Sequence, residues 1–166
     1  MKSRIQALSK ASGDELLHNA ILQSILSEIE NNQQLLDKIG EVIPFLSDGD
    51  RNIRQQALTV LAFFNSQFHI PIVQSQIAEM AAIKLSDPAC LSISCGIISA
   101  NIQYIKDKSL IEKIFVILIN SDLRANLYSA RLSAYKNFDA LISLDHPLID
   151  GVDEYISKNG EAVIES

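Results

Sequence analysis

The stretch "PFLSDGDRNIRQQALTVLAFF", residues 44–64, contains the boundary that decides the fold. Its first apolar run ends at the Ser-Asp-Gly-Asp sequence of residues 47–50, and such clusters are typical of turns. After this turn, Ile53, Ala57 and Leu61 follow one another at intervals of four residues, the spacing of an amphipathic helix. The stretch therefore predicts two helices joined by a short turn.

Apolar residues keep three- and four-residue intervals through nearly the whole chain, and no two-residue alternation typical of strands is present. An all-α fold is therefore expected. Helices are predicted at 14–31, 33–47, 51–66, 71–86, 88–105, 107–120 and 123–143, with a short helix after Pro147.

The breaks between these helices have the chemistry of helix boundaries. A carboxylate at a helix start can accept the free backbone N–H groups and interacts favourably with the helix dipole. Pro71 and Pro88 are predicted in first turns, where a missing N–H costs nothing. Short connections imply antiparallel neighbours, and thus a series of helical hairpins. The aspartates predicted near helix starts are Asp14, Asp50, Asp87, Asp107 and Asp122.

The turn sequence recurs along the chain. "FLSDGD" at 45–50 has a counterpart in "KLSDPA" at 84–89 and a fainter one in "LINSDL" at 118–123. The aspartates concerned are Asp48, Asp87 and Asp122, so the steps are 39 and 35 residues. A period near 35–45 in a helical chain indicates stacked helix pairs that share a continuous core.

Residues 42–64 resemble a HEAT repeat. Asp48 matches the turn aspartate of that family, and Arg54 the arginine that opens its second helix. The resemblance implies that these two residues lock neighbouring units through polar contacts. In the second unit the arginine position falls on Ser92, and the third has no arginine in register. The apolar matches are Val42, Ile43, Pro44 and Leu46 before the turn, and Ile53, Ala57 and Leu61 after it.

The resemblance implies a single all-α domain, 1–166, built as a short α-α superhelix (a HEAT- or armadillo-like solenoid) of about three to four helical hairpins. Residues 1–32 are expected to form N-terminal capping helices, 33–143 the HEAT-like pairs, and 144–166 an acidic C-terminal cap and tail. The alternative is a compact helical bundle in which the aspartates recur by chance, because aspartate is common at helix starts.

Charge argues against a nucleic-acid partner. The net charge is −6, from 14 Lys and Arg against 20 Asp and Glu, whereas a nucleic-acid binder needs a basic stripe to contact phosphates. From Asp139 onward the chain has seven acids and one base, Lys158. This acidic segment is either a solvated surface or an electrostatic docking site for a basic partner.

The sequence gives no sign of a membrane, metal or cofactor site. The apolar run that includes residues 115–119 is far shorter than the roughly 18 residues of a membrane span, and residues 1–13 lack the apolar segment of a secretory signal. Cys90 and Cys95 are predicted to be buried thiols, which agrees with a cytoplasmic location. The three histidines are widely separated, so neither a metal nor a cofactor is expected.

A protein-binding role follows from the resemblance, because HEAT-like arrays usually bind another macromolecule along their inner face. The second helix of each pair lines that face, so its polar residues are the candidates for contact. Tyrosine is enriched at interface hot spots, so Tyr128 and Tyr135 are the strongest of these candidates. The predicted partner-binding residues are Arg51, Gln55, Tyr128, Arg131, Tyr135, Asp150, Asp153 and Glu154, and Thr59, Ser94 and Asn101 are expected on the same face.

Three functions are compatible with these observations. Small acidic solenoids resemble certain bacterial immunity proteins, which neutralise a toxin by occluding its active site. Nuclease toxins are commonly basic, so an acidic inhibitor gains association rate and selectivity. A generic scaffold or adaptor is the alternative, and a HEAT-like DNA glycosylase or lyase is a third. The chain has no Gly-x-Ser-x-Gly and no phosphate-binding glycine loop, so it is not expected to be an enzyme. The oligomeric state is left open.

Overall fold

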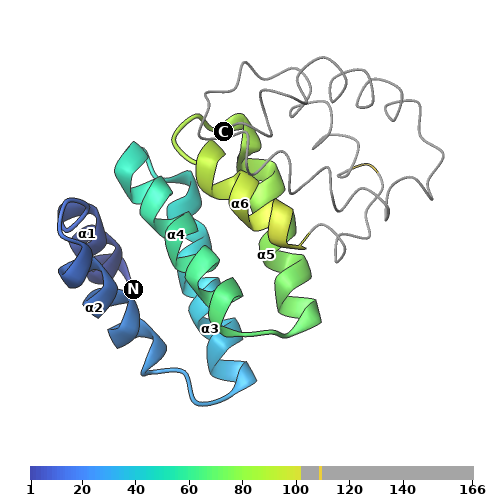
Figure 1. Cartoon of the computed structure of the whole chain (residues 1–166), viewed down its shortest axis with the longest axis horizontal. Helices are drawn as coiled ribbons and strands as arrows, with labels where there is room; N and C mark the ends of the chain where they lie inside the picture. The colour runs from blue at the N-terminus through green and yellow to red at the C-terminus, as the bar shows by residue number, and fades with distance from the viewer. Residues whose placement is uncertain (102–108, 110–166) are drawn as a thin grey trace, which may run out of the picture. The chain divides into compact units, whose positions relative to one another are not determined.

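The computed structural model describes residues 1–101 and residue 109, and every regular element in this part of the chain is helical (Figure 1). The all-α prediction is confirmed for these residues. The chain divides into two compact units, Met1–Val73 and Gln74–Ser166. The helices predicted at 107–120, at 123–143 and after Pro147 lie outside the described residues.

The first unit is organised around one helix. This helix, α4 (Arg51–Gln67), contacts α1 (Lys2–Lys10), α2 (Glu15–Leu26), α3 (Asn32–Val42) and the 3₁₀-helix η1 (Ile43–Ser47) (Figure 1). Five of its apolar side chains are buried, which gives the unit a continuous core. The buried apolar residues of the unit are Ile5, Leu8, Ala11, Leu22, Ile25, Leu35, Ile39, Val42, Leu46, Ala57, Leu58, Val60, Leu61, Phe64 and Val73.

Side-chain caps begin three of these helices. The Asp14 carboxylate accepts a 3.0 Å bond from Leu17 N at the start of α2, and Asp50 accepts a 2.8 Å bond from Asn52 N at the start of α4. The predicted capping roles of both aspartates are confirmed. Asn31 caps α3 through a 2.9 Å bond from Gln34 N, a cap that was not predicted.

The end of α2 differs from the prediction. The helix was expected to reach residue 31, but it ends at Leu26. Serine hydroxyls compete with the helix here, because Ser24 Oγ donates to Ile21 O and Ser27 Oγ donates to Ser24 O. The exposed start of the helix was also unexpected, since the Leu16 side chain is 84% exposed.

The helix predicted at 33–47 changes its pitch near its end. It is α-helical only to Val42, and residues 43–47 form the 3₁₀-helix η1. Pro44 is the physical reason, because proline has no N–H and its ring opposes a continuing α-helix. A 3₁₀ turn is a common way to finish a helix in such a case.

The face of α4 that packs into the core was largely predicted correctly. Leu61 and Phe64 are fully buried, whereas Ile53 is only half-buried. Ile53 lies in the first turn, where fewer neighbouring helices cover the side chain. Phe64 also contacts Phe68 edge-on, with ring centroids 6.5 Å apart, which extends the core to the end of the helix.

Charged side chains link α1 to the second half of α3 through Glu28, which lies in the connection between α2 and α3. Arg4 pairs with Glu28, and Lys38 Nζ lies 2.8 Å from Glu28 Oε2 and 3.6 Å from Glu41 Oε1. The hydrogen bond from Arg4 is the main cause that lowers the pKa of Glu28 to about 2, followed by the bond from Lys38. Glu28 therefore carries its charge through most of the acidic range.

In the second unit, the described elements are α5 (Pro71–Ile83), which begins three residues before the unit boundary, the 3₁₀-helix η2 (Lys84–Ser86) and α6 (Leu91–Asn101). Pro71 begins α5 as predicted. The prediction for Pro88 is wrong, because α6 begins three residues later and Pro88 lies in the preceding turn. The side chains of Cys90 and Cys95 are buried, as expected.

The turn aspartates of the two units have the same local structure. Asp48 and Asp87 each follow a 3₁₀-helix, and each has an extended backbone. Each carboxylate accepts a bond from the N–H two residues later, at 2.8 Å from Asp50 N and 3.0 Å from Ala89 N. A leucine two residues before each aspartate is buried. The sequence recurrence therefore corresponds to a recurring local conformation.

Candidate functional site

A polar recess of about 390 Å³ opens on the surface of the first unit. It lies where the turn between α1 and α2, the first two turns of α2, and the N-terminal half of α4 come together. Its volume is in the lower part of the range of about 300–1,000 Å³ found for ligand sites. The residues that line it are Ser12, Gly13, Glu15, His18, Gln55 and Gln56.

The turn before α2 fixes the position of the first three lining residues. Asp14 N donates to Ala11 O at 2.9 Å, which closes the turn, and the Asp14 carboxylate caps α2. Ala11 is buried at 3% exposure and anchors the turn to the core. Glu15 is thereby held at the first position of α2, exposed and at the edge of the recess.

A hydrogen bond across the recess joins α2 to α4. His18 Nε2 lies 2.8 Å from Gln56 Oε1, and the Gln56 side chain is only 8% exposed. With the amide oxygen facing the ring, the imidazole Nε2–H donates. A buried amide needs such a partner, because an unsatisfied buried polar group is costly. The bond sets the depth of the recess and holds both side chains in one geometry.

The predicted residues of α4 lie on one stripe of the helix. Arg51 is exposed, Gln55 is half-buried and lines the recess, and Thr59 is half-buried with its hydroxyl bonded to Gln55 O at 2.9 Å. The recess thus includes one predicted partner-binding residue and lies one turn from another. Tyr128, Arg131, Tyr135, Asp150, Asp153 and Glu154 lie outside the described residues, and their binding roles remain predictions.

Two residues expected on the same face are buried instead. Ser94 is 0% exposed and Asn101 is 1% exposed, and the Asn101 amide donates to Ile97 O at 2.7 Å. The expectation that they belong to an exposed binding face is therefore wrong. The short polar side chain of Asn101 fits inside a helical core because it bonds to the helix backbone, and the sequence pattern does not distinguish this case from exposure.

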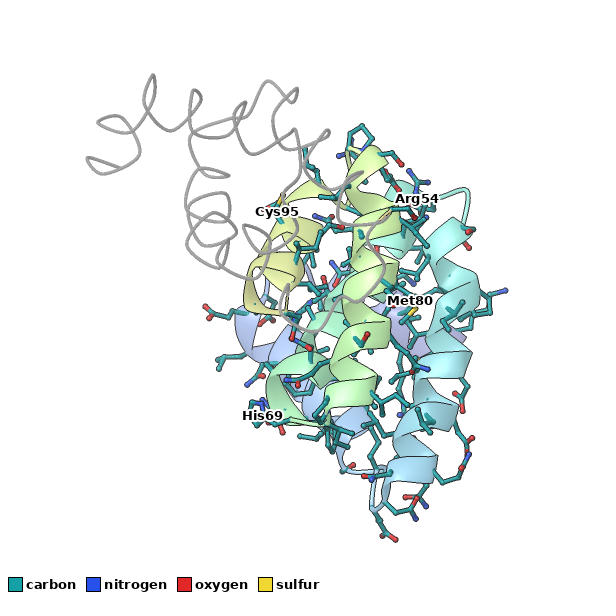
Figure 2. All side chains as sticks on the ribbon, turned by 90° about the vertical axis from the view of Figure 1, so that its right-hand side faces the viewer. Arg54, His69, Met80 and Cys95 are labelled. Carbon is teal, nitrogen blue, oxygen red and sulfur yellow. The ribbon has the colours of Figure 1, made fainter. Side chains whose placement is uncertain are left out.

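The two residues predicted to have structural roles, Asp48 and Arg54, meet at the turn. Arg54 Nη1 donates to Asp48 O at 2.9 Å and to Gly49 O at 3.2 Å. The guanidinium thus binds the carbonyls of its own turn at the start of α4, and His69 follows the other end of this helix (Figure 2). The contact explains how Arg54 stabilises the turn, and the locking of neighbouring units remains a prediction.

Glu15 and His18 were not predicted as site residues. They are three residues apart on α2 and so project from the same side of that helix. The available signal was a polar pair at a helix start that an aspartate caps. This signal is weak, because the recess also depends on the contact of His18 with a residue 38 positions away.

The described residues contain no group of three or more His, Cys, Asp or Glu that is able to hold a metal ion. Within the same residues, no helix has the length and apolar character needed to cross a membrane. Comparisons with protein-family models, with curated proteins and with solved structures give no match. The recess, its hydrogen bond and the exposed side chains of Leu16 and Leu17 on α2 are therefore the features that bear on function.

Proposed function

We propose that this chain is a protein-binding module built from HEAT-like helix pairs. The recurrence of the same aspartate turn after η1 and η2 supports the repeated architecture. In such an architecture each helix pair buries its apolar face against the next, and the outer side chains are available to a partner.

The observation that carries the binding role is an exposed apolar pair on α2, the helix that supplies Glu15 and His18 to the polar recess. Leu16 is 84% exposed and Leu17 is 51% exposed, and both lie in the first turn of the helix. They project from other sides of α2 than Glu15 and His18, because successive residues of a helix point in different directions. Exposed single apolar residues are common on protein surfaces. Here two large ones share one helical turn with hydrogen-bonding side chains, and protein interfaces also combine apolar and hydrogen-bonding groups. We call this first turn of α2, with Glu15, Leu16, Leu17 and His18, the α2 surface.

The partner that fits best is basic. The whole chain has a net charge of −6, and acidic residues dominate after Asp139. Opposite charges increase the rate at which two proteins meet and oppose the binding of acidic competitors. In its most concrete form, the proposal is that the protein neutralises a basic, nuclease-type toxin domain by covering its active site. An adaptor that joins two other proteins is the alternative.

Binding measured on a purified partner tests the proposal. The partner is identified by co-purification with the full chain and then titrated against three forms: wild type, Leu16→Ser/Leu17→Ser, and the control Leu36→Ser. Leu36 is 39% exposed on α3, so the control also removes an exposed leucine. We expect the double variant to bind at least tenfold more weakly and the control to bind as the wild type does. Unchanged binding of the double variant would contradict the proposed surface.

If the protein neutralises a toxin, as an immunity protein does, it should inhibit its partner as well as bind it. The purified partner should lose its enzymatic activity in the complex, and cells that express it should survive when this chain is co-expressed. The triple variant Asp150→Asn/Asp153→Asn/Glu154→Gln should associate more slowly, with a weaker salt dependence. A partner that keeps its activity in the complex would favour the adaptor role instead.

A further inference from the structure

The lining of the recess shows which chemistry it can recognise. Glu15 contributes a carboxylate, Gln55 and Gln56 contribute amide groups, Ser12 contributes a hydroxyl, and His18 contributes an imidazole whose Nε2 bonds to Gln56 Oε1. No lysine or arginine lines the recess. The carboxylate is its fixed charge, and with several acceptor oxygens around it the recess favours a cationic donor. We propose that this recess receives an arginine side chain from the partner protein, an inference that rests on the proposed binding function.

An anion is disfavoured by the way α2 begins. The free N–H groups at a helix start would otherwise attract an anion. Here the Asp14 carboxylate already accepts the bond from Leu17 N at 3.0 Å. Glu15 adds a second carboxylate at the first position of the same helix. Two carboxylates in the first turn therefore repel an incoming phosphate or carboxylate and attract a cation.

Arginine fits better than lysine because the acceptors come from two helices. The guanidinium is planar and presents five N–H donors in a fixed fork, so it can bond to separated acceptors at once. Glu15 lies on α2, and Gln55 lies on α4. Gln56 Oε1 already accepts from His18 and keeps a second lone pair for the ligand. A lysine ammonium is a point charge and would satisfy fewer of these groups.

The test uses a small probe and needs no partner. The full ¹⁵N-labelled chain is titrated with Nα-acetyl-arginine methylamide, and the same titration is repeated with the corresponding lysine and citrulline compounds. Citrulline has nearly the same shape as arginine but no charge. We expect millimolar binding of the arginine probe, with the largest shifts at Gln55, Gln56 and His18, and at least tenfold weaker binding of citrulline. Equal binding of lysine would overturn the choice of arginine.

Two variants locate the binding. Glu15→Gln removes the carboxylate from the recess, and Glu30→Gln removes one from the exposed connection before α3. Both glutamates are exposed, so neither change should unfold the chain, which a thermal melt would verify. We expect the first variant to bind the arginine probe about tenfold more weakly and the second to bind as the wild type does. Equal losses in both variants would mean general charge attraction and would overturn the site.

The two proposals fail in different ways. If Leu16→Ser/Leu17→Ser weakens binding of the purified partner but Glu15→Gln does not, the arginine inference fails and the proposed function stands. If the probe binds the recess and Glu15→Gln abolishes this binding, while the leucine variant keeps full affinity for the partner, the arginine site stands and the proposed docking surface fails.

Discussion

Replacement of Leu61 by alanine should destabilise the first unit strongly. Leu61 lies on α4 with 0% exposure, at the centre of the core. Removing three buried carbon atoms loses their transfer free energy and leaves a cavity, which together cost about 2–5 kcal/mol at such sites. Alanine is the best helix former, so the change does not weaken α4 through its backbone preference. The loss is therefore a measure of packing.

Leu16→Ala is the matched control for this change. It removes the same atoms from a helix, but the Leu16 side chain is 84% exposed. Its free energy of unfolding should change by less than about 0.5 kcal/mol, as for most surface substitutions. The pair of variants thus compares burial directly, with chemistry and secondary structure held constant.

Urea unfolding followed by far-ultraviolet circular dichroism provides the measurement. The chain has no tryptophan, and its four tyrosines are at position 104 or later, so fluorescence does not report on residues 1–73. With a urea dependence of about 2 kcal/mol per molar, a loss of 2–5 kcal/mol lowers the midpoint by about 1–2.5 M. A shift for Leu61→Ala no larger than that for Leu16→Ala would refute the assignment of the buried face of α4.

Three other changes test separate features of the first unit. Gly40→Ala should stabilise the chain by about 0.5–1 kcal/mol in urea unfolding, because Gly40 is an exposed residue of α3 with open space where a Cβ would lie; a loss of stability would contradict this geometry. Arg54→Ala should cost about 1–3 kcal/mol through the lost bonds to the turn carbonyls, whereas the exposed control Arg51→Ala should change little. The pKa of Glu28 is lowered from 4.5 to about 2, so its contribution is fully present above pH 4.5 and is lost as pH falls toward 2. Glu28→Gln should therefore reduce the change of melting temperature with pH between these two values. If the variant and the wild type show the same pH dependence, the ion pairs of Glu28 with Arg4 and Lys38 are not its cause.

Helix positions could be predicted from the sequence where an apolar stripe and a capping residue agree. The start of α4 is such a case, because Asp50 caps the helix that the spacing of Ala57 and Leu61 predicts. The end of α2 could not be predicted in this way. Its apolar spacing continues to Ile29, but local serine hydrogen bonds end the helix at Leu26. Side-chain competition for backbone groups is decided by energies of about 1 kcal/mol, which residue spacing does not report.

The recess shows a second limit of the sequence pattern. Gln55 could be assigned to the polar side of α4 because the period of the helix separates its polar side from its buried side, and its partner-binding role remains a prediction. Glu15 and His18 could not be assigned to the same site, since nothing within α2 tells which residue of α4 they will meet. The His18–Gln56 bond joins positions 38 apart, and only the packing of the two helices brings them together. A site formed between elements requires their arrangement as well as their individual patterns.

The two turn aspartates separate what recurs in this chain from what does not. Asp48 and Asp87 accept the same backbone hydrogen bond in similar turns, so this turn is a local feature that both units share. In the register that puts Ser92 at the position of Arg54, Gln55 corresponds to Ile93, which is apolar, whereas Gln55 lines the recess. The polar stripe of α4 is therefore not reproduced on α6. If the described residues bind a partner, the specificity must come from what is particular to the first unit, and the recess between α2 and α4 is where that difference lies.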